Sequence, residues 1–212
     1  IPGPDEHFLI NPVGVMFEEM TASCLVKVDI DGNILSESEF GINPAGYTIH
    51  SAVHMGRKDA GCVMHTHTAA GLGVATQKSG LLPLTQMALA VIAQTGYHDY
   101  EGPAFDLRER DRLINDLASN NVLILRNHGL LTVGKTVAEA FVWLFRAERA
   151  CRFQLSFQQA GAPAQEIPKE VQDISIERSK KAISASGHRP IGQFEWPALL
   201  RKLNRENPGY AE

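Results

Sequence analysis

Three histidines are the side chains of this sequence best suited to chemistry: His65, His67 and His128. His65 and His67 are one residue apart, and alternate side chains of an extended strand point the same way. His128 lies in a Gly-flanked turn much later in the chain and can supply a third imidazole. Three protein ligands plus one open position are usual for catalytic zinc, whereas structural zinc is closed by four. The pattern predicts a divalent metal site.

The other histidines have simpler interpretations. His50 and His54 are four residues apart and would share one face of a helix. The glutamate and following histidine of the metalloprotease pattern are absent, so we expect both to pack or to support a ligand from behind. His7 and His188 lie near polar stretches that contain Pro and Gly, and we expect no role in a site for either.

The hydrophobic pattern indicates the elements that must position the triad. Residues 60–67 form a compact apolar strand with the histidine pair at its end. Residues 122–125 and 129–134 predict two further strands, with His128 in the turn between them. Small residues at 69–75 predict a tightly packed helix, and Thr136 caps the longest helix of the chain. The site should therefore lie at strand ends, where chemistry is usually placed.

The remaining segments predict a mixture of strands and helices. The expected elements are a strand at 8–10, a turn at 11–14, an alternating strand at 25–30 ending in a hairpin signal at 31–33, a helix at 47–55, a helix followed by extended chain at 84–94, and a helix N-terminus at 106–109. Residues 158–169 read as a linker. The rest of the chain predicts short amphipathic helices and a polar tail.

The composition fits an ordinary globular domain. The chain has 212 residues, with 44% hydrophobic and 21% charged side chains, and can bury a full core. A formal net charge of -4 and dispersed basic residues argue against nucleic acid or an anionic membrane as partner. No apolar run reaches membrane-spanning length. The first residue is Ile1 and not methionine, so we expect a further segment to precede it.

Three cysteines indicate the compartment. Cys24, Cys62 and Cys151 are odd in number and widely spaced, so a disulfide framework is not expected. Each lies in an apolar stretch and is expected to be a small buried hydrophobe. The cytoplasm is therefore the expected location.

Several motifs together resemble the class II aldolase/adducin family. They are the segments 64–68 and 123–131 around the triad, 11–14 followed by 19–23, and 97–102. The resemblance runs from about Phe8 to the helix ending near Phe157. It implies a single three-layer α/β/α domain, residues 1–157, with a central, mostly antiparallel sheet. Residues 158–212 would be the linker and a C-terminal helical extension, packing on the same domain or on a neighbouring subunit.

The resemblance also implies a chemistry. His65, His67 and His128 match the family's metal ligands, and the metal is typically zinc. The family includes lyases and epimerases that act on small hydroxy-carbonyl compounds through an enediolate. Asn11 and Gly14 match a substrate-binding segment. Family members assemble into homotetramers, so the expected partners are a small carbonyl compound and further copies of the chain.

One departure from the aldolases separates two hypotheses. Their acid/base carboxylate and phosphate-binding hydroxyls would fall at Pro44, Ala45 and Gly46, which supply neither. The loss favours a ligand without phosphate, and it leaves the proton-transfer group open.

Several residues could replace that group. Tyr100, and Tyr210 from a neighbouring subunit, are candidates by resemblance. Glu18 and Glu19 follow the turn at 11–14, and residues 97–101 offer further titratable groups, among them His98. The first hypothesis is a metal-dependent enzyme. The alternative is a non-catalytic, adducin-like oligomerisation or binding module that keeps a structural metal.

Overall fold

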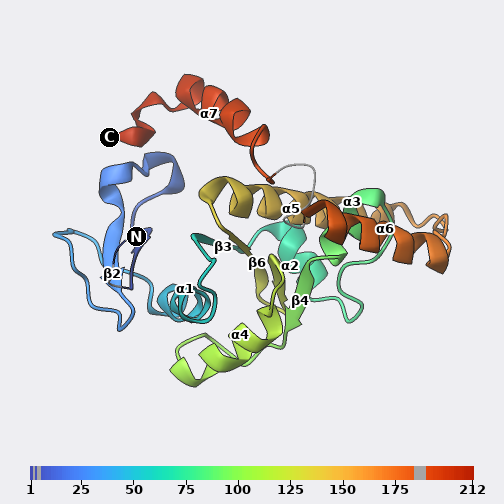
Figure 1. Ribbon diagram of the computed structural model, residues 1–212, viewed down its shortest axis with the longest axis horizontal. Coiled ribbons are helices and arrows are strands. Elements are labelled where there is room, and N and C mark those ends of the chain that lie inside the picture. The colour runs from blue at the N-terminus through green and yellow to red at the C-terminus, as the bar shows by residue number, and fades with distance from the viewer. Residues whose placement is uncertain (2, 4–5, 184–189) are drawn as a thin grey trace.

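A four-stranded sheet lies at the centre of the structure, between two layers of helices (Figure 1). This computed structural model describes residues 1, 3, 6–183 and 190–212, so His188 lies outside the described residues. The strand order is β3 (Cys62–Thr66), β6 (Gly129–Gly134), β5 (Val122–Leu125), β4 (Thr95–His98). β6 pairs antiparallel with β3 and with β5, while β4 runs parallel to β5. The expected three-layer α/β/α fold with a mostly antiparallel sheet is confirmed.

Both faces of the sheet are covered, because β5 sends apolar side chains to each side in turn. Val122 and Ile124 join one core cluster, and Leu123 and Leu125 join another. The first cluster lies under α2 (Ala69–Ala75), α3 (Gln86–Ile92) and α5 (Val137–Ala160); the second lies under α1 (Pro44–Gly56) and α4 (Arg110–Leu117). A strand buried on two faces reads as a continuous apolar run, as this one does.

The helices begin at residues whose side chains can satisfy free backbone N–H groups. Asn43, Thr68 and Thr136 accept hydrogen bonds from the first turns of α1, α2 and α5. α5 continues past Phe157 to Ala160 and stops where Gly161 adopts a left-handed conformation. The linker expected from residue 158 therefore begins at 161, because the helix has no breaker before Gly161.

A small N-terminal lobe lies beside α1. Its strands β1 (His7–Ile10) and β2 (Val26–Asp29) pair antiparallel, and the 3-10 turns η1 (Phe17–Glu19) and η2 (Ala22–Cys24) lie between them. The lobe is joined to α1 by Tyr47, whose hydroxyl donates to the carbonyl of Ile30 at 2.5 Å. The expected hairpin after β2 is reduced to a single bridge between Val28 and Ile34.

The C-terminal part follows the body of the domain without a core of its own. α6 (Lys169–Ile183) packs beside α3, and α7 (Glu195–Glu206) contacts α5 through Trp196 and Phe141 at 5.8 Å between ring centroids. α7 has no buried residue, and the final 3-10 turn η4 (Pro208–Ala211) lies against η2. Figure 1 shows α7 arching from α5 toward the N-terminal lobe. No helix among the described residues is long and apolar enough to span a membrane.

The cysteines correct one expectation. Only Cys151 is fully buried, and Cys24 and Cys62 are half-buried. Burial raises the pKa of Cys62 to about 11 and that of Cys151 to about 12, so both are protonated thiols at neutral pH. Cys24 lies in η2 and not in a core strand, so it is less buried than expected. A hydrogen bond from Thr21 lowers the pKa of its thiol.

Candidate metal centre

The backbone brings the three histidines together at one end of the sheet. β6 lies between β3 and β5, so the turn from β5 to β6 ends beside the last residue of β3. Thr66 pairs with Leu130, and His128 precedes β6 in that turn. A Cβ on Gly129 would overlap the carbonyl oxygen of Thr66, which explains why glycine is needed there. β3 ends at Thr66, so His67 lies just beyond the strand that was expected to carry it.

The three imidazoles form a compact cluster. One ring nitrogen from each of His65, His67 and His128 lies within 4.8 Å of the other two. The Nε2 atoms of His65 and His67 are 2.8 Å apart. His65 Nδ1 is 3.0 Å from the carbonyl oxygen of Leu130, and because a carbonyl only accepts, Nδ1 carries the hydrogen. Nε2 of His65 is thereby left as the nitrogen that faces the cluster.

The electrostatics favour neutral rings. Burial, followed by the charge of His128, lowers the pKa of His65 to about 3. Burial and the charge of His67 lower the pKa of His128. A metal ion binds only the neutral imidazole, so a cluster that resists protonation is already in the state that a cation requires.

The side chains of Thr66 and Thr68 point away from the imidazoles, as the alternation along a strand predicts. Thr68 Oγ1 donates to Glu148 of α5 at 2.5 Å and accepts from the backbone of Gly71 at the start of α2. Thr66 Oγ1 is buried without a partner. Glu148 therefore belongs to the face of the sheet opposite the imidazoles.

The other expected site residues lie at different distances from the cluster. Tyr100 is close, with its ring centroid 6.4 Å from that of His128, and it is half exposed. Tyr210 lies on η4 against the N-terminal lobe, and none of its described contacts is with the triad. Asn11 and Gly14 lie in the exposed loop after β1, where Gly14 has a φ of 92°.

α1 brings a fourth imidazole toward the cluster. Gly46 lies in the first turn of α1, and a Cβ there would meet only Asn43, at 3.6 Å. His50 follows one turn later, and burial, followed by the charge of His54, lowers its pKa to about 4. The charge of His50 in turn contributes to the low pKa of His65. The sequence predicts that His50 packs or supports a ligand from behind, and its effect on the pKa of His65 fits the second of these roles.

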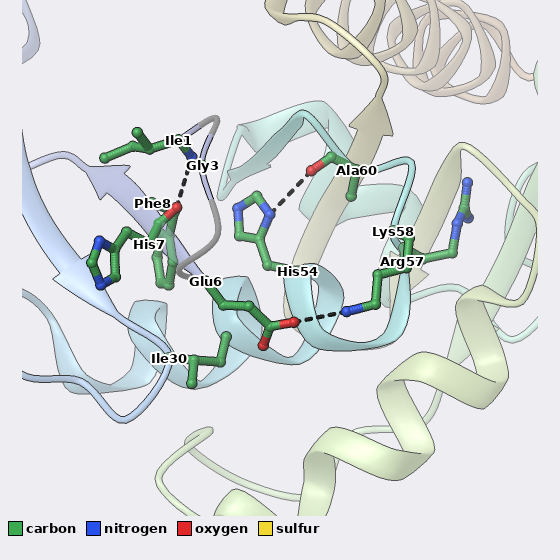
Figure 2. A pocket seen from close by; sticks show the side chains of 10 residues that line it. All are labelled: Ile1, Gly3, Glu6, His7, Phe8, Ile30, His54, Arg57, Lys58 and Ala60. Carbon is green, nitrogen blue, oxygen red and sulfur yellow. Dashed lines mark hydrogen bonds and ion pairs between the residues drawn. The ribbon is translucent and has the colours of Figure 1, made fainter.

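His54 packs as expected, and it borders a separate cavity. Its ring lies 4.8 Å from that of Phe8, and its Nδ1 donates to the carbonyl of Ala60. Figure 2 shows this cavity of about 210 Å³ between the N-terminal lobe and α1, with the Lys58–Glu6 ion pair at 2.7 Å among its lining residues. None of the three clustered histidines lines it. The cavity is thus distinct from the candidate metal centre.

Proteins of similar sequence identify the family of this chain. Residues 1–155 match the family described as the class II aldolase and adducin N-terminal domain. A protein of Caulobacter vibrioides, provisionally named as an aldolase class 2 protein, is 50% identical over 212 residues, which are all of this chain and 81% of that protein. Alpha-adducin of Rattus norvegicus is 40% identical over 215 residues, covering 97% of this chain and 29% of the adducin.

Solved structures show the same fold. An aldolase II superfamily protein from Pseudomonas syringae superposes with a TM-score of 0.91 at 48% identity, covering all of this chain and 83% of the other. An L-fuculose 1-phosphate aldolase from Glaciozyma antarctica superposes with a TM-score of 0.80 at 25% identity, covering 98% and 78%. The chain belongs to the class II aldolase and adducin N-terminal domain family.

Proposed function

We propose that this chain is a divalent metal-dependent enzyme, a lyase or epimerase acting on a small hydroxy-carbonyl or sugar-derived compound. The observation that carries the proposal is the cluster of three imidazoles, whose nitrogens lie within 4.8 Å of one another at the end of a rigid sheet. A set of three neutral nitrogen donors suits Zn²⁺, and it leaves a position open for substrate. The similarity to an L-fuculose 1-phosphate aldolase supports the reaction class.

The residues of the chain have separate tasks in this proposal. His65 is oriented by the carbonyl of Leu130, which fixes the tautomer that presents Nε2. His128 is held in place by the turn that Gly129 permits. A bound divalent metal would supply Lewis-acid polarisation of the substrate carbonyl. Tyr100 is our candidate to hold or move a proton, at its phenolic oxygen, because its ring lies 6.4 Å from that of His128.

A second candidate function is a non-catalytic, adducin-like module with a structural metal. Gly46 favours it, since the first turn of α1 offers no carboxylate for proton transfer. The 40% identity to an alpha-adducin favours it as well. Under this alternative the imidazoles hold a metal that stabilises an oligomer.

The proposal also includes an oligomeric state, a division into domains and a location. Exposed aromatic side chains such as Phe17 (82% exposed) and Phe145 (50%) suit burial between copies, and we propose a homotetramer. Residues 1–157 would form the catalytic domain and residues 158–212 an extension, with Asn11 and Gly14 near the substrate and Tyr210 reaching a neighbouring subunit. The cytoplasm suits the free thiols. We expect neither nucleic acid nor a membrane to be a partner.

The test is to strip the protein of metal, reload it separately with Zn²⁺, Co²⁺ and Mn²⁺, and measure both bound metal and turnover. The substrates would be phosphorylated and unphosphorylated hydroxy-carbonyl compounds that can undergo retro-aldol cleavage or epimerisation. The enzyme proposal expects one metal per chain and metal-dependent turnover that His67→Ala abolishes. His54→Asn, a packed histidine outside the cluster, is the matched control.

The outcomes separate the two candidates. Bound metal without turnover, with an oligomer that dissociates when His67 is replaced, would establish the structural module instead. Failure of the purified protein to bind any of the three metals would overturn both.

A further inference from the structure

A second histidine cluster lies behind the loop that carries Tyr100. His98, the last residue of β4, is buried, and each of its ring nitrogens meets a carboxylate oxygen. Nδ1 is 2.7 Å from Asp116 Oδ2, and Nε2 is 3.2 Å from Glu109 Oε1. Glu109 is buried as well, while Asp116 is half exposed. The imidazole thus ties the end of β4 to both ends of α4.

Such a network is costly unless it is fully satisfied. Removing ionisable groups from water requires good geometry and complete hydrogen bonding in return. Here both nitrogens of His98 have partners. Aliphatic side chains in place of the histidine and both carboxylates would fill the same space between β4 and α4 without that cost. The arrangement therefore suits a need for a defined position more than a need for stability.

The position that it defines is that of the residues following β4. Asp99 forms an ion pair with Arg126 at 3.2 Å, and the Arg126 guanidinium lies 4.7 Å from the ring centroid of Tyr97. The backbone N–H of Arg126 donates to the carbonyl of His98 at 2.9 Å. On the far side, Glu101 accepts two hydrogen bonds from Arg112 of α4. The residues on each side of Tyr100 therefore have partners, just after β5 and on α4, that Tyr100 lacks among the described residues.

Tyr100 itself has no such support. Its hydroxyl has no hydrogen-bond partner among the described residues, and its side chain is 53% exposed. Its ring nevertheless lies 6.4 Å from that of His128. The place of the phenol near the triad is therefore set by the backbone that His98 and its neighbours hold.

We infer that His98 is a positioning residue, which through Glu109 and Asp116 holds the Tyr100 phenol beside the histidine triad. The inference rests on the proposed function for the value of that placement, since the phenol is useful there only if a proton must be moved. The location of Tyr100 then depends on a histidine outside the triad, whose ring nitrogens are both bound to carboxylates of this chain.

The test follows the Tyr100 ring directly. The full chain is labelled with 3-fluorotyrosine, and the Tyr100 resonance is assigned among the four tyrosines with Tyr100→Phe. The change that His128→Ala causes in this resonance is then measured in the wild-type background and with His98→Leu, in metal-free protein. We expect a clear change in the wild type and its loss with His98→Leu. In Co²⁺-loaded protein, the paramagnetic shift of the same resonance should fall while Co²⁺ affinity is retained.

Two further variants protect the test. Glu109→Gln keeps the shape of the buried partner and replaces its charge, so it serves if His98→Leu does not fold; the same loss of response is expected, in a smaller degree. His98→Asn keeps a donor near Asp116 and should restore part of the response. His54→Asn, a packed histidine remote from this loop, should leave it unchanged.

The outcomes are distinct from those of the proposed function. A folded His98→Leu or Glu109→Gln protein in which Tyr100 still responds to His128→Ala as in the wild type overturns the positioning role. If the wild type binds no Co²⁺, the proposed metal function fails. The metal-free comparison still decides whether His98 positions Tyr100.

Discussion

Two histidine clusters in this domain differ in what surrounds the imidazoles. In the triad, His65 has two other imidazoles as neighbours, and burial, followed by the charges of these neighbours, lowers its pKa to about 3. In the second cluster, His98 has a carboxylate oxygen on each side. The first arrangement leaves a nitrogen lone pair facing a shared space. The second commits both nitrogens to internal partners.

The difference shows that the neighbours of a histidine, and not its burial, decide what it can do. Neutral imidazoles whose nitrogen lone pairs face a common space can bind a cation placed between them. An imidazole between acids has no free atom for a ligand, but it joins distant elements firmly. The triad is suited to bind a cation, and the His98 cluster is suited to join β4 to α4. Each of the following predictions tests this difference.

The largest expected effect is on metal binding. His65→Ala should weaken Zn²⁺ or Co²⁺ binding by at least about 1,000-fold, or ~4 kcal/mol, because it removes a ligand and not only a supporting contact. His98→Leu should leave the affinity nearly unchanged. Titration of metal-free protein with Co²⁺, followed by visible absorption, measures both. Equal losses in the two variants would show that the clusters do not have separate roles.

The next effect is on the free energy of unfolding, which the His98 variant should lower more than the triad variant does. His98→Leu should lower the free energy of unfolding by about 3 kcal/mol, because Glu109 stays buried without its partner. His67→Ala, at an exposed position, should cost metal-free protein much less. Urea unfolding of both variants without metal gives the comparison. A metal-free His67→Ala protein as unstable as His98→Leu would mean that the triad also serves as a structural element.

The sequence made the triad predictable but not the second cluster. His65 and His67 are one residue apart on a strand, and the turn with His128 follows another strand, so period-two geometry and turn chemistry were enough. The two carboxyl partners of His98 come from the N-cap of α4, Glu109, and from its last turn, Asp116. Their approach depends on how α4 packs against β4, a tertiary contact that no local pattern encodes.

The same distinction explains where the elements predicted from the sequence differ from those in the structure. Strands buried on both faces, such as β5, were found because their composition is uniformly apolar. The end of α5 at Ala160 and the short bridge after β2 depend on where packing stops, so local composition placed them inexactly. Whether His50 packs or supports a ligand from behind depends on the contact of α1 with the sheet, which the spacing of residues in the sequence does not encode.

The third effect is a dependence on pH. His50 is neutral in the folded protein down to about pH 4, whereas its ordinary pKa is 6.5. Above pH 6.5 His50 is neutral in both the folded and the unfolded state, so it adds no pH dependence to stability there. Between pH 6.5 and 4 only the unfolded chain takes up the proton, and stability falls as the pH falls, by about 1 kcal/mol per pH unit.

The measurement compares metal-free wild type with His50→Gln in urea at pH 7.5, 6 and 5. The variant should lose less stability across this range, because it has no proton to gain at that position. Burial is the main reason for the low pKa of His65, so most of the contribution of His65 remains in both proteins. Parallel stability curves for the two proteins would contradict the burial of His50 as a neutral group.

The smallest expected effect concerns Gly46, and it tests whether a carboxylate can be added to the binding cluster. A Cβ at Gly46 has ordinary van der Waals room, so Gly46→Ala should stabilise α1 by roughly 0.5–1 kcal/mol. Gly46→Glu should be at least as stable, since an acidic side chain in the first turn of a helix meets the positive end of its dipole. If it also raises metal-dependent turnover relative to Gly46→Ala, the missing group was a proton-transfer carboxylate. If turnover does not differ between the two variants, the proton in this protein is handled by another group, and Tyr100, held from behind by His98, is the one that the geometry favours.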